Sequence, residues 1–366
     1  MKIVLTGGGT GGHLIPLIAV KREIQKINPD TQFLFLGPDG KLEKQLMSAE
    51  NILQKKVLSG KMRRYFSPLN FLDFFKIPLG IIQALWILLW FMPEAVFSKG
   101  GYASVPVVVA AWIYRIPVLI HESDADPGLA NSMLAKFSER IAVSYPQAEK
   151  IFPATQVVLT GNPLREDIAK GDPQKARELF HFLPDKKTIF IWGGSLGARV
   201  INEHVVEILP DLLRHHQVIH QTGEKNIEDV KHKAGVLGIK AGREGYHAVP
   251  FIGEELKDIL ALADIVISRA GSNSISEIAA NKKPAIIIPI ENSANGHQKT
   301  NAYAVGQAGG CLVLEENNLG ENSLLRAIEK ILADEQLRAK MVKNIDAFYQ
   351  PDAAHRIAEG VIGMVK

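Results

Sequence analysis

Residues 2–13 read KIVLTGGGTGGH, and this stretch decides the fold. An apolar run with strong β propensity leads directly into a glycine-rich turn, after which Leu14, Leu17, Ile18 and Ile24 recur at helical spacing. A buried strand that passes through glycines into a helix is typical of the first unit of a parallel α/β sheet. Glycines let a ligand approach the backbone, and the helix start offers free N–H groups to an anion.

Outward from this stretch, apolar runs of strand length alternate with helical patterns, and the alternation restarts once. The restart follows residues 161–173, which are rich in proline, glycine and charge, and begins with the strand-like run 187–192. This pattern predicts an α/β protein with two parallel-sheet domains, 1–163 and 164–349. The other expected elements are strands at 31–36, 95–97, 117–121, 140–143, 157–159, 217–221, 248–251, 264–268, 285–289 and 311–314, one amphipathic helix at 322–348, a break at 349–351 and a short terminal helix.

Composition narrows the class of protein. The 366 residues carry 42 Lys and Arg against 39 Asp and Glu, and this small excess argues against a dedicated nucleic-acid binder. A single cysteine, Cys311, excludes a disulfide framework and a cysteine-rich zinc site. Glycines stand where a secretion signal needs an apolar run, so a cytoplasmic protein is expected. Residues 1–163 hold 17 basic and 12 acidic side chains, which suits an anionic partner or surface.

One segment, residues 69–92, is unusually apolar and reads LNFLDFFKIPLGIIQALWILLWFM. The longest stretch without a charge here, residues 77–93, has 17 residues, short of the roughly 20 that a spanning helix needs. Two interpretations stay open: a helix buried in the domain, or an apolar surface that dips into an anionic membrane. The second is favoured by Phe71, Phe75 and Trp86, and by the neighbouring cations Arg63, Arg64 and Lys76.

The glycine turns could hold phosphates. Gly7, Gly9 and Gly12 match the dinucleotide pattern G-x-G-x-x-G, but the second strand ends without the acidic residue that binds a ribose. Similar turns occur at residues 193–198 and 269–274, and two glycine-rich helix starts in one domain would meet at one edge of its sheet. A diphosphate would satisfy both, with Glu277 accepting hydrogen bonds from ribose hydroxyls. Tight turns, helix caps and a solvated helix face are the structural alternatives.

Two polar clusters complete the pattern. The first, His121-Glu122-Ser123-Asp124, ends an expected strand, where active-site groups of parallel sheets gather. The second, residues 297–301, carries amide side chains suited to sugar hydroxyls. The histidines of these clusters and His13 do not form a convincing ligand set, so no protein-bound metal and no cofactor are expected.

Six motifs in order resemble the MurG family of membrane-associated glycosyltransferases. They are the strand with GGTGGH, Lys99-Gly100-Gly101-Tyr102, His121-Glu122, Gly161-Asn162-Pro163-Leu164-Arg165, Gly193-Gly194-Ser195-x-Gly197-Ala198 and Ser276-Glu277-Ile278-Ala279. The resemblance implies a GT-B fold, two Rossmann-like domains facing across a cleft, with helix 350–366 completing the first. It implies an inverting transfer of N-acetylglucosamine from UDP-N-acetylglucosamine (UDP-GlcNAc) to the C4 hydroxyl of the muramyl sugar of lipid I, forming lipid II.

The resemblance also assigns roles and surroundings. It places the enzyme on the cytoplasmic face of the inner membrane, with a cell-wall or division complex as a partner. The catalytic base would be His13 or Glu122. The donor would be bound by Thr10, Gly11, Gly12, Asn131, Arg165, Ser195, Asn202, Ile252, Ser272, Asn273, Ser274, Glu277 and Gln298, and the acceptor approached by Gly9 and Tyr102. The sequence departs from the family pattern at Ser123-Asp124 and at His297.

Rival functions remain open at this stage. A UDP-GlcNAc 2-epimerase, or a GT-B transferase with another lipid acceptor, would share the fold and the donor site. An NAD-dependent oxidoreductase would explain the first glycine turn but not the second. A non-catalytic membrane adaptor would need none of the polar residues named above.

Overall fold

The computed structural model describes residues 1–8, 11–60, 68–194, 197–243, 245–291, 296–320 and 322–365. The chain forms two compact units, Met1–Arg165 with Gln350–Lys366, and Glu166–Tyr349. The boundary therefore falls two residues after the expected one, and the C-terminal segment belongs to the first unit.

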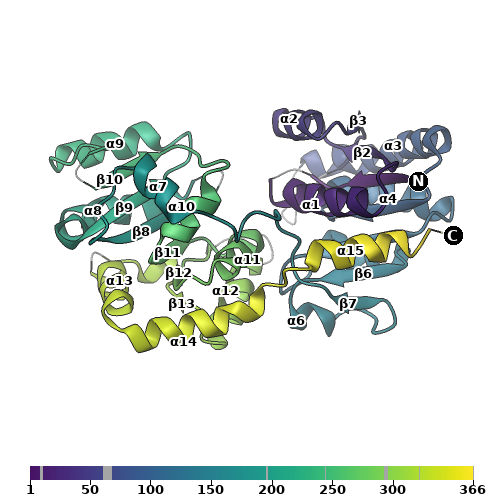
Figure 1. Ribbon diagram of the computed structural model, residues 1–366. Coiled ribbons are helices and arrows are strands. Elements are labelled where there is room, and N and C mark those ends of the chain that lie inside the picture. Colours follow the sequence, from purple (N-terminus) through teal and green to yellow (C-terminus); the bar gives the residue numbers. More distant parts are fainter. Residues whose placement is uncertain are drawn as a thin grey trace. The chain divides into compact units, whose positions relative to one another are not determined.

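The first unit is built on a seven-stranded parallel sheet with strand order β3-β2-β1-β4-β5-β6-β7 (Figure 1). Its elements are β1 (Lys2–Thr6), α1 (Gly11–Ile27), β2 (Gln32–Gly37), α2 (Lys41–Ala49), β3 (Leu53–Lys56), α3 (Pro68–Phe91), β4 (Ala95–Ser98), η1 (Tyr102–Ser104), α4 (Val105–Ile113), β5 (Val118–Glu122), α5 (Leu129–Leu134), η2 (Ala135–Phe137), β6 (Arg140–Val143), α6 (Pro146–Glu149), β7 (Val157–Leu159) and α15 (Ala353–Ile362).

The second unit repeats the architecture with a six-stranded parallel sheet of order β10-β9-β8-β11-β12-β13. Its elements are α7 (Pro173–Leu179), β8 (Lys187–Trp192), α8 (Arg199–His215), β9 (His216–Gln221), α9 (Ile227–Val236), β10 (Tyr246–Val249), α10 (Leu256–Leu262), β11 (Ile265–Ser268), α11 (Ser272–Ala280), β12 (Ala285–Ile287), α12 (His297–Gln307), β13 (Leu312–Val313), η4 (Glu316–Asn318), α13 (Ser323–Ala333), α14 (Glu335–Ile345) and η5 (Asp346–Phe348).

Both faces of the first sheet are covered, which explains why its central strands are apolar throughout. On one face, Ile3 and Leu5 of β1 pack against α1 and against Ile357 and Val361 of α15. On the other face, Val4 packs into a separate cluster formed with α3 and α4. Each such buried aliphatic side chain stabilises the fold by about 1.5–3 kcal/mol, so α15 is an integral part of the first unit.

The expected strands are confirmed to within two residues at either end. The prediction omitted β3, whose sequence LQKK is too polar to signal a strand and which lies at the edge of the sheet. The single amphipathic helix expected at 322–348 was wrong: α13 ends before Asp334, whose side chain accepts a hydrogen bond from the Leu337 N–H and caps α14. The cap satisfies backbone donors of a new helix and so ends the previous one.

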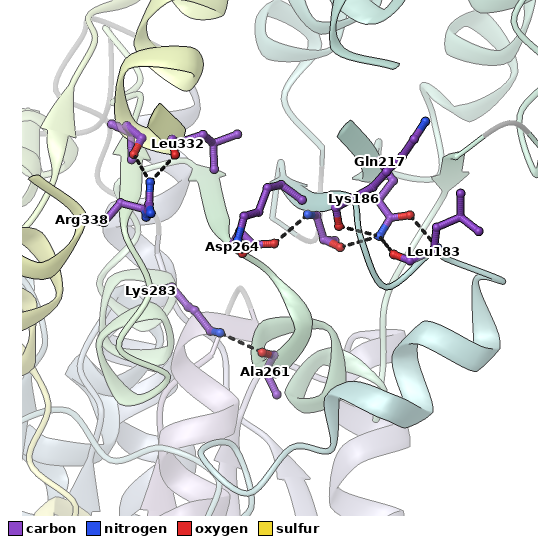
Figure 2. A network of polar contacts seen from close by, with 11 residues as sticks. Leu183, Lys186, Gln217, Ala261, Asp264, Lys283, Leu332 and Arg338 are labelled. Carbon is purple, nitrogen blue, oxygen red and sulfur yellow. Dashed lines mark hydrogen bonds and ion pairs between the residues drawn. The ribbon is translucent and has the colours of Figure 1, made fainter. Parts of the chain in front are cut away.

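A polar network holds the amino edge of the second sheet (Figure 2). The Gln217 amide donates to the Leu183 carbonyl at 3.0 Å and to the Lys186 carbonyl at 3.2 Å. The Asp264 carboxylate accepts from the Thr188 N–H at 2.8 Å, and the Lys283 ammonium donates to the Ala261 carbonyl at 2.8 Å. These contacts fix the starts of β8, β9 and β11, and thereby the register of the strand ends that carry the glycine turns.

Candidate active site

In the first unit, the candidate site lies where the strand order reverses between β1 and β4. Ligands of open α/β sheets bind at the carboxyl edge beside such a switch point. The glycine turn follows β1 there, and Lys99-Gly100-Gly101 follows β4, with the Lys99 N–H donating to the Thr6 carbonyl at 2.9 Å. Backbone φ angles of +81° at both Gly100 and Gly101 make these positions suitable for glycine alone.

His13 lies against this second turn. A β-carbon added at Gly101 would be 3.3 Å from the His13 Nε2 atom, and one added at Gly7 would be 3.8 Å from the His13 β-carbon. Burial, and to a lesser extent the nearby Lys99 ammonium, lower the pKa of His13 to about 4. The imidazole is therefore neutral near pH 7, which is the state that can accept a proton.

Glu122 lies at the end of β5 and is buried. Its Oε1 atom accepts from the Asp124 N–H at 2.9 Å, and its Oε2 atom accepts from the Gly128 N–H at 3.1 Å and from the Asn131 amide at 2.9 Å. Burial and the Asp124 charge raise the pKa of Glu122, against the opposing effect of Lys99. With both oxygens engaged, Glu122 holds the loop between β5 and α5 in place.

The second unit has its switch point between β8 and β11, and a glycine turn follows each of these strands. After β8, Gly194 has φ +74° and no atom within 4 Å of an added β-carbon, whereas a β-carbon at Gly197 would be 2.1 Å from the Thr222 carbonyl oxygen. Gly194 thus leaves open space on the ligand side, and Gly197 permits close packing of the turn on β9. Ser195 lies outside the described residues.

After β11, helix α11 begins at Ser272 with Gly271 as its N-cap. Asn273 and Ser274 stand in its first turn, and Glu277 is buried one turn further on. The turn itself is tied to α12, because the Asn301 amide donates to the Ala270 carbonyl at 3.2 Å. The first N–H groups of α11 thus lie beside the switch point, where they suit an anion.

Three further residues were predicted from the sequence to bind the sugar donor: Ile252, Gln298 and Arg165. Ile252 is buried just after β10, in a loop whose Pro250 carbonyl accepts from the Gly223 N–H at 3.1 Å. The Gln298 side chain accepts from the Ile290 N–H at 3.1 Å, which orients its amide. The buried Nη2 atom of Arg165 has no hydrogen-bond partner among the described residues.

Asn202 is placed differently from the expectation. Its side chain is only 2% exposed, donates to the Thr222 carbonyl at 3.0 Å and bonds through Oδ1 to the His220 Nε2 atom at 2.9 Å. The His220 Nδ1 atom in turn bonds to the Tyr246 hydroxyl at 3.1 Å, and burial lowers the pKa of His220 to about 3. Asn202 therefore ties α8 to β9 inside the domain. Any effect of Asn202 on binding of the sugar donor would act through the turn after β9.

The apolar segment forms α3, which is both a core helix and a surface. Ala84 and Leu88 are buried in the first unit, so the buried-helix interpretation is confirmed for that face. The opposite face is exposed: Ile82, Trp86 and Trp90 are 63%, 63% and 69% accessible. Lys76 is exposed at the same helix, while Arg63 and Arg64 lie outside the described residues and the side chains of Phe71 and Phe75 are not described. Over the parts of the chain that are described, no helix has the length and apolar character needed to cross a bilayer.

Gly11 and Gly12 open α1, Tyr102 opens η1 beside Gly101, and Gly9 and Thr10 lie outside the described residues. Two spacings associated with metal ligands do occur in the chain, Asp124-x-Asp126 and His216-x-x-x-His220. The two histidines stand at opposite ends of strand β9, where that spacing separates their side chains. No group of three His, Cys, Asp or Glu side chains in the described ranges could hold a metal ion.

Sequence reasoning quoted Lys99 and Arg269 within motifs but gave them no role, and it missed His220. Arg269 precedes α11, donates to the Ile288 carbonyl at 3.2 Å and pairs with Glu316 at 2.5 Å. A basic residue that directly follows a strand and precedes a glycine turn is a signal that could have marked Lys99, before Gly100-Gly101, and Arg269, before Ala270-Gly271. Nothing local could have marked His220, whose partners come from other elements.

Two Rossmann-like domains, each with glycine turns at the switch point of a parallel sheet, define a protein of the GT-B class. Residues 3–143 match the glycosyltransferase family 28 N-terminal domain, and residues 188–357 match the C-terminal domain of the same family. The chain belongs to glycosyltransferase family 28.

Curated relatives and solved structures agree with this assignment. The chain is 40% identical, over 90% of its own length and of the relative's, to the UDP-N-acetylglucosamine--N-acetylmuramyl-(pentapeptide) pyrophosphoryl-undecaprenol N-acetylglucosamine transferase of Clostridium perfringens (strain SM101 / Type A). A Bacillus anthracis transferase of the same name, numbered 2, is also 40% identical, over 90% of this chain and 91% of its own. The crystal structure of Acinetobacter baumannii MurG superposes with a TM-score of 0.76 at 25% identity, covering 99% of both chains. The expected resemblance to the MurG family is confirmed.

A UDP-GlcNAc 2-epimerase from Neisseria meningitidis has a TM-score of 0.70 at 15% identity, covering 99% of this chain and 100% of its own. At that identity the likeness concerns the fold alone. The two activities share an architecture, so the distinction between them rests on the acceptor.

Proposed function

We propose that this protein transfers N-acetylglucosamine from UDP-GlcNAc to the C4 hydroxyl of the muramyl sugar of lipid I, forming lipid II for peptidoglycan. The observation that carries the proposal is the pair of glycine-rich helix starts at one switch point in the second unit, with Glu277 buried behind the second. Relatives at 40% identity over 90% of the chain carry the name of this transferase.

The proposed mechanism is a direct displacement at the anomeric carbon, with inversion. The acceptor hydroxyl forms the new glycosidic bond, the bond to UDP breaks, and the hydroxyl proton passes to the neutral imidazole of His13. Glu122 serves as a positioning residue, because its two oxygens already accept three hydrogen bonds from the loop that follows β5. The charge on departing UDP is met by the N–H groups at the start of α11 and by Arg165.

The deciding experiment incubates the purified protein with radiolabelled UDP-GlcNAc and a lipid I analogue. We expect label in a disaccharide lipid. Conversion of the donor to its 2-epimer without transfer, or transfer only to another lipid, would replace this function by one of its two rivals.

We further propose that the transfer requires no divalent cation, because helix N-termini and backbone amides supply the positive charge. The same assay run in EDTA is expected to keep the rate within about twofold of the untreated enzyme, since preorganised donors of this kind supply roughly 2.7–4 kcal/mol each. Abolition by EDTA with rescue only by Mg²⁺ or Mn²⁺ would show this proposal to be wrong.

We also propose that the exposed face of α3 docks the enzyme on the cytoplasmic surface of an anionic membrane, where cell-wall or division proteins would be its neighbours. The rings of Trp86 and Trp90 pack edge to face on this side of the helix, with their centroids 5.9 Å apart, and Lys76 is exposed on the same helix. Aromatic side chains flanked by cations favour an anionic lipid interface.

Vesicle binding tests the docking surface. Replacing Trp86 and Trp90 together by serine should lower partition onto phosphatidylglycerol vesicles at least tenfold, because each buried aromatic side chain contributes about 1.5–3 kcal/mol. Val236→Ser is the matched control, since Val236 is a 74% exposed apolar side chain of the second unit. Equal binding by the double variant and the wild-type protein would rule out α3 as the docking surface.

A further inference from the structure

The segment that leaves β12, residues 288–291, is held by side chains from three other parts of the second unit. Its first carbonyl accepts a hydrogen bond from the Arg269 guanidinium at 3.2 Å. Its third N–H donates to the Gln298 Oε1 atom at 3.1 Å, and its fourth N–H donates to the Glu316 Oε2 atom at 3.2 Å. Gln298, which the proposed function assigns to the sugar of the donor, is thus bonded to a segment that Arg269 and Glu316 also hold.

Arg269 and Glu316 are themselves joined by a largely buried ion pair. The Arg269 Nη2 and Glu316 Oε1 atoms are 2.5 Å apart, and the two side chains are 11% and 16% exposed. Exposed ion pairs contribute little because solvent screens them, whereas loss of one member of a buried pair leaves the other charge without compensation. This pair therefore fixes η4 against the turn that follows β11.

Each oxygen of the Glu316 carboxylate has a different partner. Oε1 faces the Arg269 guanidinium and Oε2 accepts from the Glu291 N–H. A carboxylate can accept hydrogen bonds at both oxygens, whereas an amide of the same size offers one acceptor and one donor. The position therefore requires an acidic side chain if both contacts are to be kept.

The turn between β11 and α11 has a support of its own. The Asn301 amide donates to the Ala270 carbonyl at 3.2 Å, and the Ser268 hydroxyl donates to the Arg269 carbonyl at 3.1 Å. Loss of the Glu316 carboxylate would therefore release residues 288–291 more than the start of α11. Since the start of α11 is proposed to meet the diphosphate, the two parts of the donor should depend on Glu316 to different degrees.

We propose that Glu316 is a positioning residue for the sugar of the donor. With Arg269 it fixes residues 288–291, and these hold the Gln298 amide in the orientation in which it meets the sugar hydroxyls. The inference rests on the proposed function for the identity of the donor and for the role of Gln298. It adds that Glu316 supports binding of the sugar and not of the uridine diphosphate.

Calorimetric titrations with UDP-GlcNAc and with UDP test the inference. Glu316→Gln keeps the size of the side chain and removes one of its two acceptors. We expect the affinity for UDP-GlcNAc to fall roughly 3- to 10-fold, as for loss of one neutral hydrogen bond, and the affinity for UDP to stay within about twofold. Glu335→Gln alters an exposed carboxylate of α14 in the same unit and, as the matched control, should bind both ligands like the wild type.

A double-mutant cycle tests whether Glu316 acts through Gln298. Gln298→Ala alone should cause a similar loss that is confined to UDP-GlcNAc. Adding Glu316→Gln to Gln298→Ala should lower the affinity by less than about twofold more, because changes that act through one shared contact are not additive. Losses that multiply in the combined variant would show that the two residues act independently, and would overturn the inference.

A second variant separates positioning from general stability. Arg269→Met with Glu316→Met removes both charges together, so that neither is left uncompensated in the interior. It should unfold in urea like the wild type and still lose affinity for UDP-GlcNAc alone. Equal losses for UDP and UDP-GlcNAc, or no loss, would overturn the inference and leave the proposed function intact.

Failure of the proposed function would be recognised separately. If the wild-type protein does not bind UDP-GlcNAc, the proposed function fails and the inference fails with it. If the variants lose UDP-GlcNAc affinity selectively but the wild type transfers no sugar to lipid I, only the proposed acceptor is wrong and the role of Glu316 stands.

Discussion

Replacement of His13 by alanine is expected to lower kcat for sugar transfer by about 10²- to 10⁴-fold, the range of general-base catalysis. The KM for UDP-GlcNAc should change little, because His13 belongs to the first unit and the proposed donor residues around α11 belong to the second. Steady-state kinetics with the lipid I analogue measures both constants. A kcat within threefold of the wild type would exclude His13 as the base.

The pH profile separates the two candidate bases. A base must be unprotonated to act, so activity is present above its pKa and is lost as the pH falls through it. Because burial and Lys99 lower the pKa of His13 to about 4, a His13 base predicts a rate that is flat near neutrality and falls only near pH 4. The pKa of Glu122 is raised, so a Glu122 base predicts an acid limb above the ordinary carboxyl range. Glu122→Gln, which removes the charge, should then abolish that limb.

Replacement of Gly100 by alanine is expected to destabilise the first unit by about 2–5 kcal/mol. Its φ of +81° costs an L-residue roughly 1–2 kcal/mol, and the added β-carbon would lie 2.2 Å from the Asn131 Oδ1 atom. Asn131 is buried and bonded to Glu122 and to the His121 carbonyl, so moving it breaks hydrogen bonds worth about 1–3 kcal/mol more. Urea denaturation measures the change in free energy of unfolding.

Gly238→Ala is the matched control for this prediction. Gly238 has nearly the same φ, +80°, but no atom lies within 4 Å of an added β-carbon. It should cost only the backbone strain, roughly 1–2 kcal/mol. Equal destabilisation by the two variants would show that the contact with Asn131 contributes nothing.

The strands and the glycine turns could be predicted because their signals are local. Each central strand is a short apolar run, and each turn combines glycines with the start of a helical pattern, as in residues 2–13. The edge strand β3 and the end of α13 at Asp334 could not be predicted in this way. The first is polar because one side of it has no neighbouring strand, and the second depends on a cap that competes with a continuous amphipathic pattern.

The candidate site could likewise be predicted only where its signals are local in the sequence. The motifs around His13, Glu122 and Glu277 were recognisable as sequence, but their partners were not. Only the fold shows that the Asn202 side chain is hydrogen-bonded to His220 and Thr222 inside the second unit. Likewise, only the fold shows that the Glu122 carboxylate accepts three hydrogen bonds.

The sequence by itself determined the α/β class, the presence of two domains, the glycine turns and the family, because these depend on periodicity and on contiguous motifs. The tertiary structure alone decided which strands flank each switch point, that α15 packs on α1, and that Lys99 is buried. The physical reason is that the burial and the charge environment of a residue depend on neighbours that come from distant parts of the chain. Strand order sets those neighbours, and no local pattern encodes it.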